Sequence, residues 1–216
     1  MTREAMVNIR KYFFAAILAA PILLFSSCLG VEADVKISAS GSGAIDLEYR
    51  MSEELVAFGE LDANKTLLPV PVSRSDFERG ISAYKGLKLE SWSDSKDGTD
   101  LVVKARVSFD DLSSLTKFLD PRGNLASYSE NAGKKTLRFV FGEPLGELDA
   151  ETAALAAEAL APYSMKLTLR LPSPPTESTA RGEGTKAWIE GQSAKFESSM
   201  KGIALSPQPA GWTVSW

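Results

Sequence analysis

The feature that most restricts the fold of this chain is a set of paired stretches in which apolar and polar residues alternate. In the stretch Leu101–Phe109, the residues from Val103 to Phe109 alternate strictly between apolar and polar or charged. This stretch follows Leu87–Ser93 across Asp97-Gly98, a dipeptide that favours tight hairpin turns. Because a period of two places alternate side chains on opposite faces, the pattern predicts an antiparallel hairpin with one covered face.

Two more hairpins are predicted in the same way. The first joins Val35–Ser40 to Ala44–Tyr49 through a Gly-Ser-Gly turn, where glycine can adopt a positive φ. The second joins Leu125–Ser129 to Thr136–Phe141 through an Asn-Ala-Gly turn. Three hairpins in one chain indicate a fold dominated by antiparallel pairing.

Helices are predicted after the hairpins. Ser75–Lys85 begins with Ser-Asp-Phe-Glu, which has the spacing of a capping box. A second helix over Asp111–Leu119 is expected to be capped by Asp110 or Asp111, and a third over Asp149–Ala161 begins at Asp149, since aspartate favours the N-cap position. A shorter helix is expected over Ser52–Phe58. These elements together predict an α+β fold, in which an antiparallel sheet is built from successive hairpins and helices pack on one of its faces.

The first residues form an export signal that ends at the only cysteine of the chain. Two basic residues precede the apolar stretch Tyr12–Phe25, and Ser26-Ser27 separates that stretch from Cys28. The stretch is shorter than the roughly 20 apolar residues that span a bilayer. A single thiol forms no internal disulfide, and the position of Cys28 resembles a bacterial lipobox, in which the cysteine becomes a diacylglycerol-modified N-terminus. Phe25 replaces the usual leucine of that motif, so an ordinary signal peptide and an uncleaved anchor stay open as alternatives.

Four segments follow from these patterns. Residues 1–27 are expected to be a lipoprotein signal peptide, 28–33 a tether and 34–172 the α+β domain. Residues 173–216 begin at a proline-rich break and are expected to form a C-terminal β segment, which completes the same domain or forms a small appendage. Its strand candidates are Lys186–Glu190, Lys195–Ser198 and Trp212–Trp216.

Composition excludes several classes of function. The chain has no histidine and a net charge of −4. The lack of histidine excludes histidine-dependent nucleophilic mechanisms and, because the only cysteine is assigned to lipidation, it also excludes most zinc and transition-metal sites. The negative net charge gives no indication of nucleic-acid binding. We therefore expect no cofactor and no metal, and membrane attachment through acyl chains on Cys28 rather than through basic residues.

Apolar side chains of the predicted helices and strands allow two interpretations. The first is an ordinary core between the sheet and its helices. The second is an apolar cavity that holds an acyl chain or another apolar ligand. The candidate ligand-binding residues are Phe77, Ile81, Val107, Phe109, Leu115, Phe118 and Phe139.

The order of these motifs resembles a known family of bacterial lipoproteins. After the lipobox and the first hairpin, a strand enters an Asp-capped helix at Val107–Leu115, and Leu167–Pro172 and Trp212–Trp216 follow. This layout, over residues 34–216, is similar to that of bacterial lipoproteins with an LppM-type domain and of some spirochaete lipoproteins. The resemblance implies an α+β domain anchored in the cell envelope, with a role in binding lipids or glycolipids and with no catalytic residues.

Three functions are compatible with the sequence. The first is a non-catalytic, extracytoplasmic lipoprotein, anchored to a bacterial membrane, that binds an apolar or amphiphilic ligand such as a lipid or glycolipid. The alternative is a structural or assembly factor that binds another envelope protein through a sheet edge or the C-terminal strands. An enzyme that uses carboxylates alone is the third.

Overall fold

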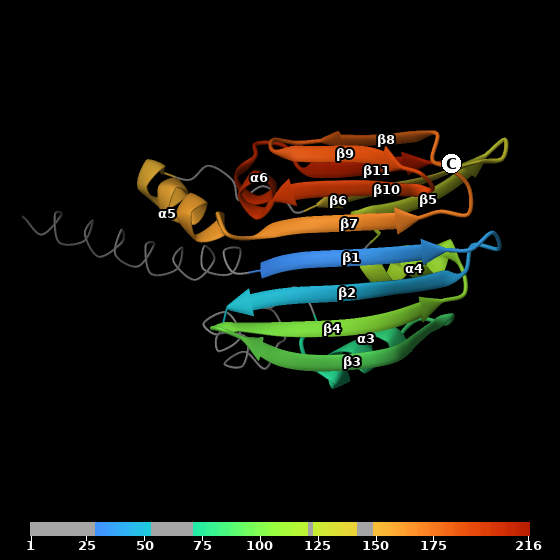
Figure 1. Cartoon of the computed structure of the whole chain (residues 1–216), viewed down its shortest axis with the longest axis horizontal. Helices are drawn as coiled ribbons and strands as arrows, with labels where there is room; N and C mark the ends of the chain where they lie inside the picture. Colours follow the sequence, from blue (N-terminus) through green and yellow to red (C-terminus); the bar gives the residue numbers. More distant parts are fainter. Residues whose placement is uncertain (1–28, 53–70, 121–122, 142–148) are drawn as a thin grey trace, which may run out of the picture.

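The computed structural model describes residues 29–52, 71–120, 123–141 and 149–216. Strands dominate these residues, and they form two sheets (Figure 1). The large sheet has the strand order β3-β4-β2-β1-β7-β10-β9, and the small sheet has the order β5-β6-β11-β8. The strands of the large sheet are β1 (Leu29–Ile37), β2 (Gly43–Ser52), β3 (Leu87–Asp97), β4 (Asp100–Phe109), β7 (Ser164–Arg170), β9 (Thr185–Glu190) and β10 (Ser193–Ser199).

The three predicted hairpins are all present, as β1–β2, β3–β4 and β5–β6. The β1–β2 turn needs glycine for two reasons. Gly41 has a φ of +89°, which favours glycine, and a Cβ built on Gly43 would lie 1.9 Å from the carbonyl oxygen of Lys36. Any side chain at Gly43 would therefore push β2 away from β1.

The small sheet was not predicted. Its strands are β5 (Ala126–Asn131), β6 (Lys134–Phe141), β8 (Glu177–Arg181) and β11 (Ala210–Ser215). The hairpin β5–β6 is not part of the large sheet, and β6 instead pairs with β11, which also pairs with β8. The expectation of one sheet is thus corrected to two, because the third hairpin finds its partner in the last strand of the chain rather than in the second hairpin.

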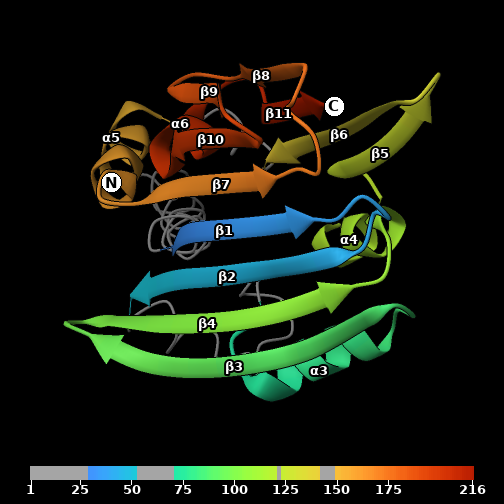
Figure 2. The ribbon, with the colours of Figure 1, turned by 45° about the vertical axis from the view of Figure 1, so that its right-hand side comes forward.

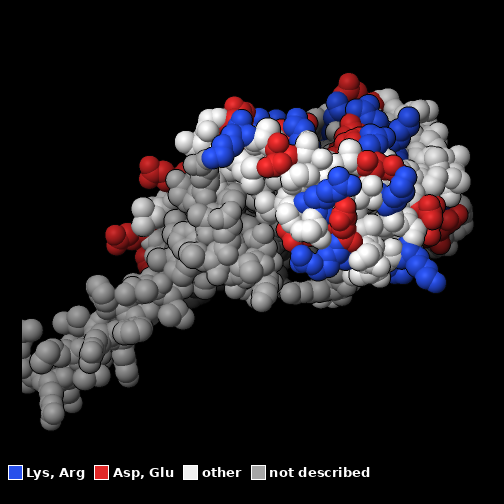
Figure 3. Space-filling model, turned by 90° about the horizontal axis from the view of Figure 1, so that it is seen from below, with Lys and Arg blue, Asp and Glu red and all other residues white. Residues whose placement is uncertain are grey.

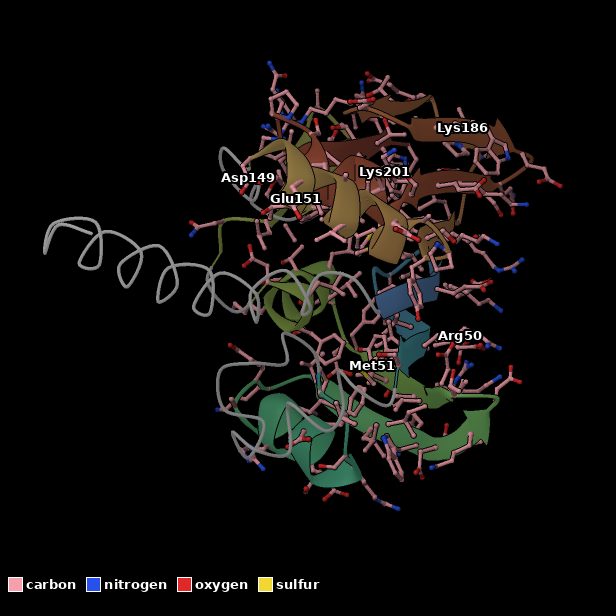
Figure 4. The ribbon with its side chains drawn as sticks, turned by 90° about the vertical axis from the view of Figure 1, so that its left-hand side faces the viewer. Arg50, Met51, Asp149, Glu151, Lys186 and Lys201 are labelled. Carbon is pink, nitrogen blue, oxygen red and sulfur yellow. The ribbon has the colours of Figure 1, made fainter. Side chains whose placement is uncertain are left out.

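The large sheet has one covered face and one open face. The small sheet covers part of the inner face, and α3 and α4 lie over the part formed by β2, β4 and β3 (Figure 2). Arg50 and Met51, which are neighbours on β2, point to opposite sides (Figure 4). Met51 is 0% exposed on the inner face, whereas Arg50 is exposed on the outer face. Helices on one face were expected, but they are few and short, and a second sheet supplies much of the cover.

The four described helices are α3 (Arg74–Ser82), α4 (Leu112–Leu119), α5 (Ala150–Leu160) and α6 (Met200–Leu205). Asp149 caps α5 as predicted, and of the two candidate caps Asp110 and Asp111 it is Asp111 that caps α4. The predicted cap of α3 is wrong by two residues. Ser73, not Ser75, is the N-cap, and Asp76 completes the capping box by accepting a hydrogen bond from the backbone N–H of Ser73. The helix expected over Ser52–Phe58 lies outside the described residues, apart from Ser52.

The predicted tether over residues 28–33 is also corrected. Strand β1 begins at Leu29, and Leu29–Ala33 pairs with Leu47–Met51 of β2. Within this segment, Ala33 is buried in the core with an exposure of 5%, and Val31 packs against the core. A segment that buries one face and pairs its backbone belongs to the folded domain, so any lipid on Cys28 would join directly to the sheet.

Strands from both sides of the Pro172–Pro175 break contribute to both sheets. In the large sheet, β10 pairs with β7, and β9 pairs with β10. In the small sheet, β11 pairs with β6, and β8 pairs with the other side of β11. Residues 173–216 are thus integrated with the strands that precede the break.

Aromatic rings join the two sheets. Phe196 of β10 lies with its ring centroid 4.9 Å from that of Phe141 and 5.7 Å from that of Trp212, and Trp212 stacks on Phe139 at 5.9 Å. The indole N–H of Trp212 donates to the hydroxyl of Ser178, so its polar atom is satisfied in the core. Phe139 was expected to face helices, but this cluster places it against the large sheet.

Candidate functional site

The seven predicted ligand-binding residues belong to the core. Phe77, Val107 and Leu115 are 0% exposed, and Phe118 is partly buried against the same cluster. The ring of Phe77 stacks on that of Tyr49, which fixes α3 on β2. All seven are brought into one apolar cluster, and the full set is Phe77, Ile81, Val107, Phe109, Leu115, Phe118 and Phe139.

A hollow of about 450 Å³ lies elsewhere, at the carboxyl ends of β1 and β7. None of the seven predicted residues is among the described residues that line it. We call it the β1/β7 hollow, and the lining residues used below are Lys36, Ile37, Ser38, Arg170, Leu171 and Gln192. Its volume falls within the range of ligand sites, about 300–1,000 Å³.

The topology explains why the hollow forms at this place. Strands β1 and β7 are the parallel pair of the large sheet, and the pairing ends at Lys36 and Arg170. Beyond that point the chain leaves β1 toward β2 on one side, and it leaves β7 toward the small sheet on the other. Divergence of neighbouring parallel strands opens a crevice outside their carboxyl ends, as it does in open α/β sheets.

The floor of the hollow is apolar and is fixed by the backbone. Ile37 and Leu171 are 4% exposed each and belong to the core. The backbone N–H of Leu171 donates to the carbonyl oxygen of Gln192 at 2.9 Å, which holds the β9–β10 turn against the end of β7. The backbone hydrogen bond and the burial of both side chains fix the position of the floor.

Charged side chains stand at the side of the hollow. The guanidinium of Arg170 donates from Nε to Oδ1 of Asp34 at 2.8 Å and from Nη2 to Oδ2 at 2.5 Å. These hydrogen bonds and the charge of Asp34 raise the pKa of Arg170 above its ordinary value. Lys36 makes no ion pair with any described residue. Since Asp34 neutralises Arg170, the ammonium of Lys36 is the uncompensated charge at the hollow.

A group of hydroxyls lies at the edge of the hollow. Ser38, Ser40 and Ser42 of the β1–β2 turn have their Oγ atoms 2.8–3.0 Å apart. Ser38 itself lines the hollow. Hydroxyls both donate and accept, so together with the ammonium of Lys36 they can bind phosphate oxygens or sugar hydroxyls.

The open face beside the hollow carries charges of both signs. Asp34 of β1 and Asp46 of β2 are direct cross-strand neighbours, an arrangement that like charges disfavour. Each forms an ion pair with an arginine of the neighbouring strand on its other side: Asp34 pairs with Arg170 of β7, and Asp46 pairs with Arg106 of β4. On the side of the molecule seen in Figure 3, from below the view of Figure 1, basic and acidic side chains of the described residues are likewise interspersed. This face is a balanced, solvated surface rather than a patch of one sign.

Two further properties concern the described part of the chain. It contains no helix that combines the length and the apolar character needed to cross a membrane. It also contains no group of three or more acidic or cysteine side chains placed to hold a metal ion.

The residues of the hollow were not singled out by the sequence. Lys36 and Arg170 are ordinary polar positions of alternating strands, and nothing in their spacing indicates that they come together. Their proximity depends on the parallel pairing of β1 with β7, which are separated by most of the chain. The only sequence signal near the site is the proline that follows Leu171, where β7 must end.

Comparisons with known proteins add little to this picture. No protein-family model matches the chain, and no curated protein matches it. Among solved structures, the chain is similar to the folded domain of Mycobacterium tuberculosis LppM determined by NMR, with a TM-score of 0.47 and 13% identity. The similarity covers 88% of this chain and 90% of that chain.

Proposed function

We propose that this chain is a lipoprotein of the bacterial cell envelope, anchored through acyl chains on Cys28, which binds an amphiphilic ligand without catalysing a reaction. The observation that carries the ligand proposal is the composition of the β1/β7 hollow. The ammonium of Lys36 and the hydroxyl of Ser38 stand over an apolar floor formed by Ile37 and Leu171. Such a site suits a lipid or glycolipid whose acidic, hydroxyl-bearing head group has apolar atoms next to it.

The position of the anchor relative to the hollow supports a particular mode of binding. Strand β1 begins directly after Cys28 and has 9 residues. At about 3.3 Å per residue, its two ends are about 26 Å apart. The hollow lies at the far end from the anchor. When β1 stands upright on the membrane, the head group is therefore bound away from the bilayer, as in a protein that receives or presents amphiphiles.

The carboxylates beside the hollow take part in ion pairs within the sheet. Asp34 binds Arg170, and Asp46 binds Arg106. A carboxylate that acts as a general acid or base must reach the reacting atom of a bound substrate. Because the oxygens of both carboxylates already accept from arginines of the same sheet, this pair is a structural charge network in our proposal.

Native mass spectrometry of the full-length protein, purified from membranes in mild detergent, tests the ligand proposal. We expect an amphiphile to co-purify, and Lys36→Glu to reduce its occupancy severalfold. Lys88→Glu is the matched control, because Lys88 is a cation on the same open face but at the β3 edge. Equal occupancy in all three proteins would contradict binding at the hollow.

The second candidate function, an assembly factor, has one observation in its favour. Trp188 and Ile189 of the edge strand β9 are 41% and 44% exposed. Exposed apolar residues on an edge strand are typical of sites where another strand pairs. Cross-linking of the full chain in the envelope, followed by identification of the linked protein, separates this function from ligand binding.

A further inference from the structure

A second hollow lies on the open face of the large sheet, at the opposite end of β1 from the β1/β7 hollow. Its volume of about 150 Å³ is small beside the about 300–1,000 Å³ of drug-sized ligand sites, so it suits a small polar group. We call it the Gly30 hollow, and the lining residues used below are Gly30, Glu32, Glu48, Arg50, Tyr163 and Lys166.

The hollow exists because a glycine stands between larger residues. Gly30 of β1 is the direct cross-strand neighbour of Arg50 on β2. A Cβ built on Gly30 would lie 3.6 Å from the ring of Tyr163 and 3.7 Å from the Cβ of Arg50, which are ordinary contact distances. The ring and the arginine stem are thus the walls of a space that the missing side chain leaves open. A side chain at this position would fit the strand and fill the hollow.

The wall formed by Tyr163 is fixed by its backbone. The N–H of Tyr163 donates to the carbonyl oxygen of Leu160 in α5 at 3.1 Å, and its carbonyl oxygen accepts from the N–H of Met200 in α6 at 3.0 Å. Figure 1 shows both helices at the end of the large sheet where β1 and β7 begin. The hollow is therefore a preformed feature of this end of the sheet.

Two of the charged side chains that line the hollow are bound within the sheet. Nη1 of Arg50 donates to Oδ2 of Asp97 at 2.8 Å, and this hydrogen bond raises the pKa of Arg50 above its ordinary value. Nζ of Lys104 lies 2.9 Å from Oε2 of Glu48. Figure 4 shows Arg50 directed away from the side on which Met51 enters the core. These charges are engaged with neighbouring strands.

The other two charges lack such partners. Glu32 of β1 and Lys166 of β7 are direct neighbours in the parallel pair, and both are exposed. Neither makes an ion pair with any residue of the described part of the chain. Neighbouring strands are about 4.8 Å apart, so a carboxylate and an ammonium stand side by side on one face. A ligand with one positive and one negative charge, joined by a short bridge, complements this pair better than a ligand of one sign.

The expected membrane anchor lies close to this hollow. Gly30 follows Cys28 by two residues, which is about 7 Å along an extended strand. The polar layer of a bilayer is about 5–8 Å thick on each side of its hydrocarbon core. With the acyl chains of Cys28 in that core, the Gly30 hollow lies at the level of the phospholipid head groups.

We propose that the Gly30 hollow binds the zwitterionic head group of a bilayer phospholipid, with the phosphate at Lys166 and the ammonium at Glu32, as in phosphatidylethanolamine. The bound lipid attaches the start of β1 to the bilayer at a second point besides the acyl chains. Two points of attachment restrict rotation of the sheet about Cys28 and keep the β1/β7 hollow at the far end. The proposal rests on the anchor of the proposed function and is independent of what the β1/β7 hollow binds.

Filling the hollow tests the site. The experiment is a calorimetric titration of the full-length protein in mild non-ionic detergent with a short-chain phosphatidylethanolamine. Each protein also carries Lys36→Glu, which weakens binding of an acidic head group at the β1/β7 hollow. Gly30→Val introduces a residue that strands favour and should weaken binding at least tenfold. Gly30→Ala, whose methyl makes only ordinary contacts, should weaken it about threefold and decides the test if Gly30→Val does not fold. Gly80→Ala in α3, where a Cβ meets nothing within 4 Å, is the matched control.

Exchanging the two free charges tests how the head group is oriented. Glu32→Gln removes the partner of the ammonium, so it should weaken phosphatidylethanolamine about tenfold. The same substitution should strengthen binding of phosphatidylglycerol, which has the phosphate but no ammonium. Lys166→Gln removes the partner of the phosphate and should weaken both lipids. Lys88→Gln, at an exposed lysine of edge strand β3, is the control for loss of a positive charge elsewhere on the open face.

Each contrary result overturns a different part of the proposal. Equal affinities of Gly30→Ala, Gly30→Val and Gly80→Ala for phosphatidylethanolamine would overturn binding in the Gly30 hollow. Equal weakening of both lipids by Glu32→Gln would overturn the assignment of the ammonium. Binding of free phosphoethanolamine as tightly as the lipid would overturn the bilayer as the source, in favour of a soluble zwitterion. The mass of the purified protein reports acylation of Cys28 separately, so a failure of the anchor is distinguishable from a failure of the head-group site.

Discussion

Arg170 at the end of β7 donates to the carboxylate of Asp34 of β1 from two guanidinium nitrogens, Nε at 2.8 Å and Nη2 at 2.5 Å. The contact joins the two parallel strands where they are about to diverge. Both side chains are partly exposed, so the pair itself contributes only about 0.2–1 kcal/mol to the free energy of unfolding. Its larger effect is on charge, because it leaves Lys36 as the uncompensated cation of the β1/β7 hollow.

The charge of the hollow predicts opposite effects for two substitutions. Asp34→Asn removes the carboxylate that neutralises Arg170, so it should raise the affinity for a short-chain phosphatidylglycerol about fivefold. Lys36→Glu should lower that affinity by at least as much. Both effects should shrink as salt is added. Calorimetric titration of the full-length protein in mild detergent measures them, and a change of the same sign in both variants would contradict the electrostatic account.

The aromatic cluster between the sheets predicts a sharp contrast between neighbouring residues. Phe139→Ala removes a ring that packs on Trp212 and Phe141 and should lower the free energy of unfolding by about 3–5 kcal/mol. Arg138→Ala changes an exposed side chain on the opposite face of β6 and should stay within about 0.5 kcal/mol. Urea unfolding of the full-length protein followed by tryptophan fluorescence measures both. Similar losses would mean that the register of β6 is different.

Local patterns predicted the hairpins because their information lies within a few residues. Alternation in Leu101–Phe109, together with the turn at Asp97-Gly98, specifies both the strands and their antiparallel pairing. The parallel pairing of β1 with β7 has no such local signal, because parallel strands are joined by long connections. The same holds for β11, whose partners β6 and β8 are set by packing rather than by a turn.

The candidate site shows the same limit more strongly. The apolar residues singled out from the sequence, such as Val107 and Leu115, were correctly identified as inward-facing, and they form the core. A site on the surface depends instead on which polar residues the topology brings together. Lys36 and Gln192 are far apart in the sequence and meet only because the β9–β10 turn lies against the end of β7.

Lipidation of Cys28 makes a prediction that is independent of the fold. Cys28→Ala should accumulate as an unprocessed precursor and incorporate no labelled palmitate, because the acyl chains are attached to this thiol in our proposal. Metabolic labelling and the mass of the mature protein measure this. Ser27→Ala is a matched control, since a small residue before the cysteine is retained. A labelled and normally processed Cys28→Ala protein would refute the anchor.

The N-cap of α3 distinguishes two serines that are close in sequence. Ser73 accepts a hydrogen bond from the backbone N–H of Asp76, so Ser73→Ala should cost about 1 kcal/mol. Ser75 lies within the helix and its hydroxyl contacts only that of Ser73 among the described residues, so Ser75→Ala should stay within about 0.5 kcal/mol. Urea midpoints of the two variants measure the difference. The reverse order would place the helix start at Ser75.

The carboxylate of Asp76 predicts a pH dependence of stability. Burial acts to raise its pKa, but hydrogen bonds from the backbone N–H and hydroxyl of Ser73, with Arg79 nearby, outweigh this effect and hold the pKa below its ordinary value of 3.8. The unfolded chain therefore takes up this proton at a higher pH than the folded chain does. The stabilisation from Asp76 is fully present above the ordinary pKa and is lost as the pH falls through the lower folded value.

Asp76→Asn should remove this part of the acid sensitivity. The difference in unfolding free energy between about pH 6 and about pH 3 should be smaller in Asp76→Asn than in the wild-type protein. Glu78→Gln is the matched control, because Glu78 is an exposed carboxylate of the same helix that pairs with Arg74 and takes no part in the cap. Urea titrations at the two pH values measure the effect. Two results would contradict the role of Asp76 in the cap. One is a pH difference in unfolding free energy that is the same in Asp76→Asn as in the wild-type protein. The other is an equal reduction of that difference in Glu78→Gln, because Glu78 accepts none of the hydrogen bonds from Ser73 that lower the pKa of Asp76.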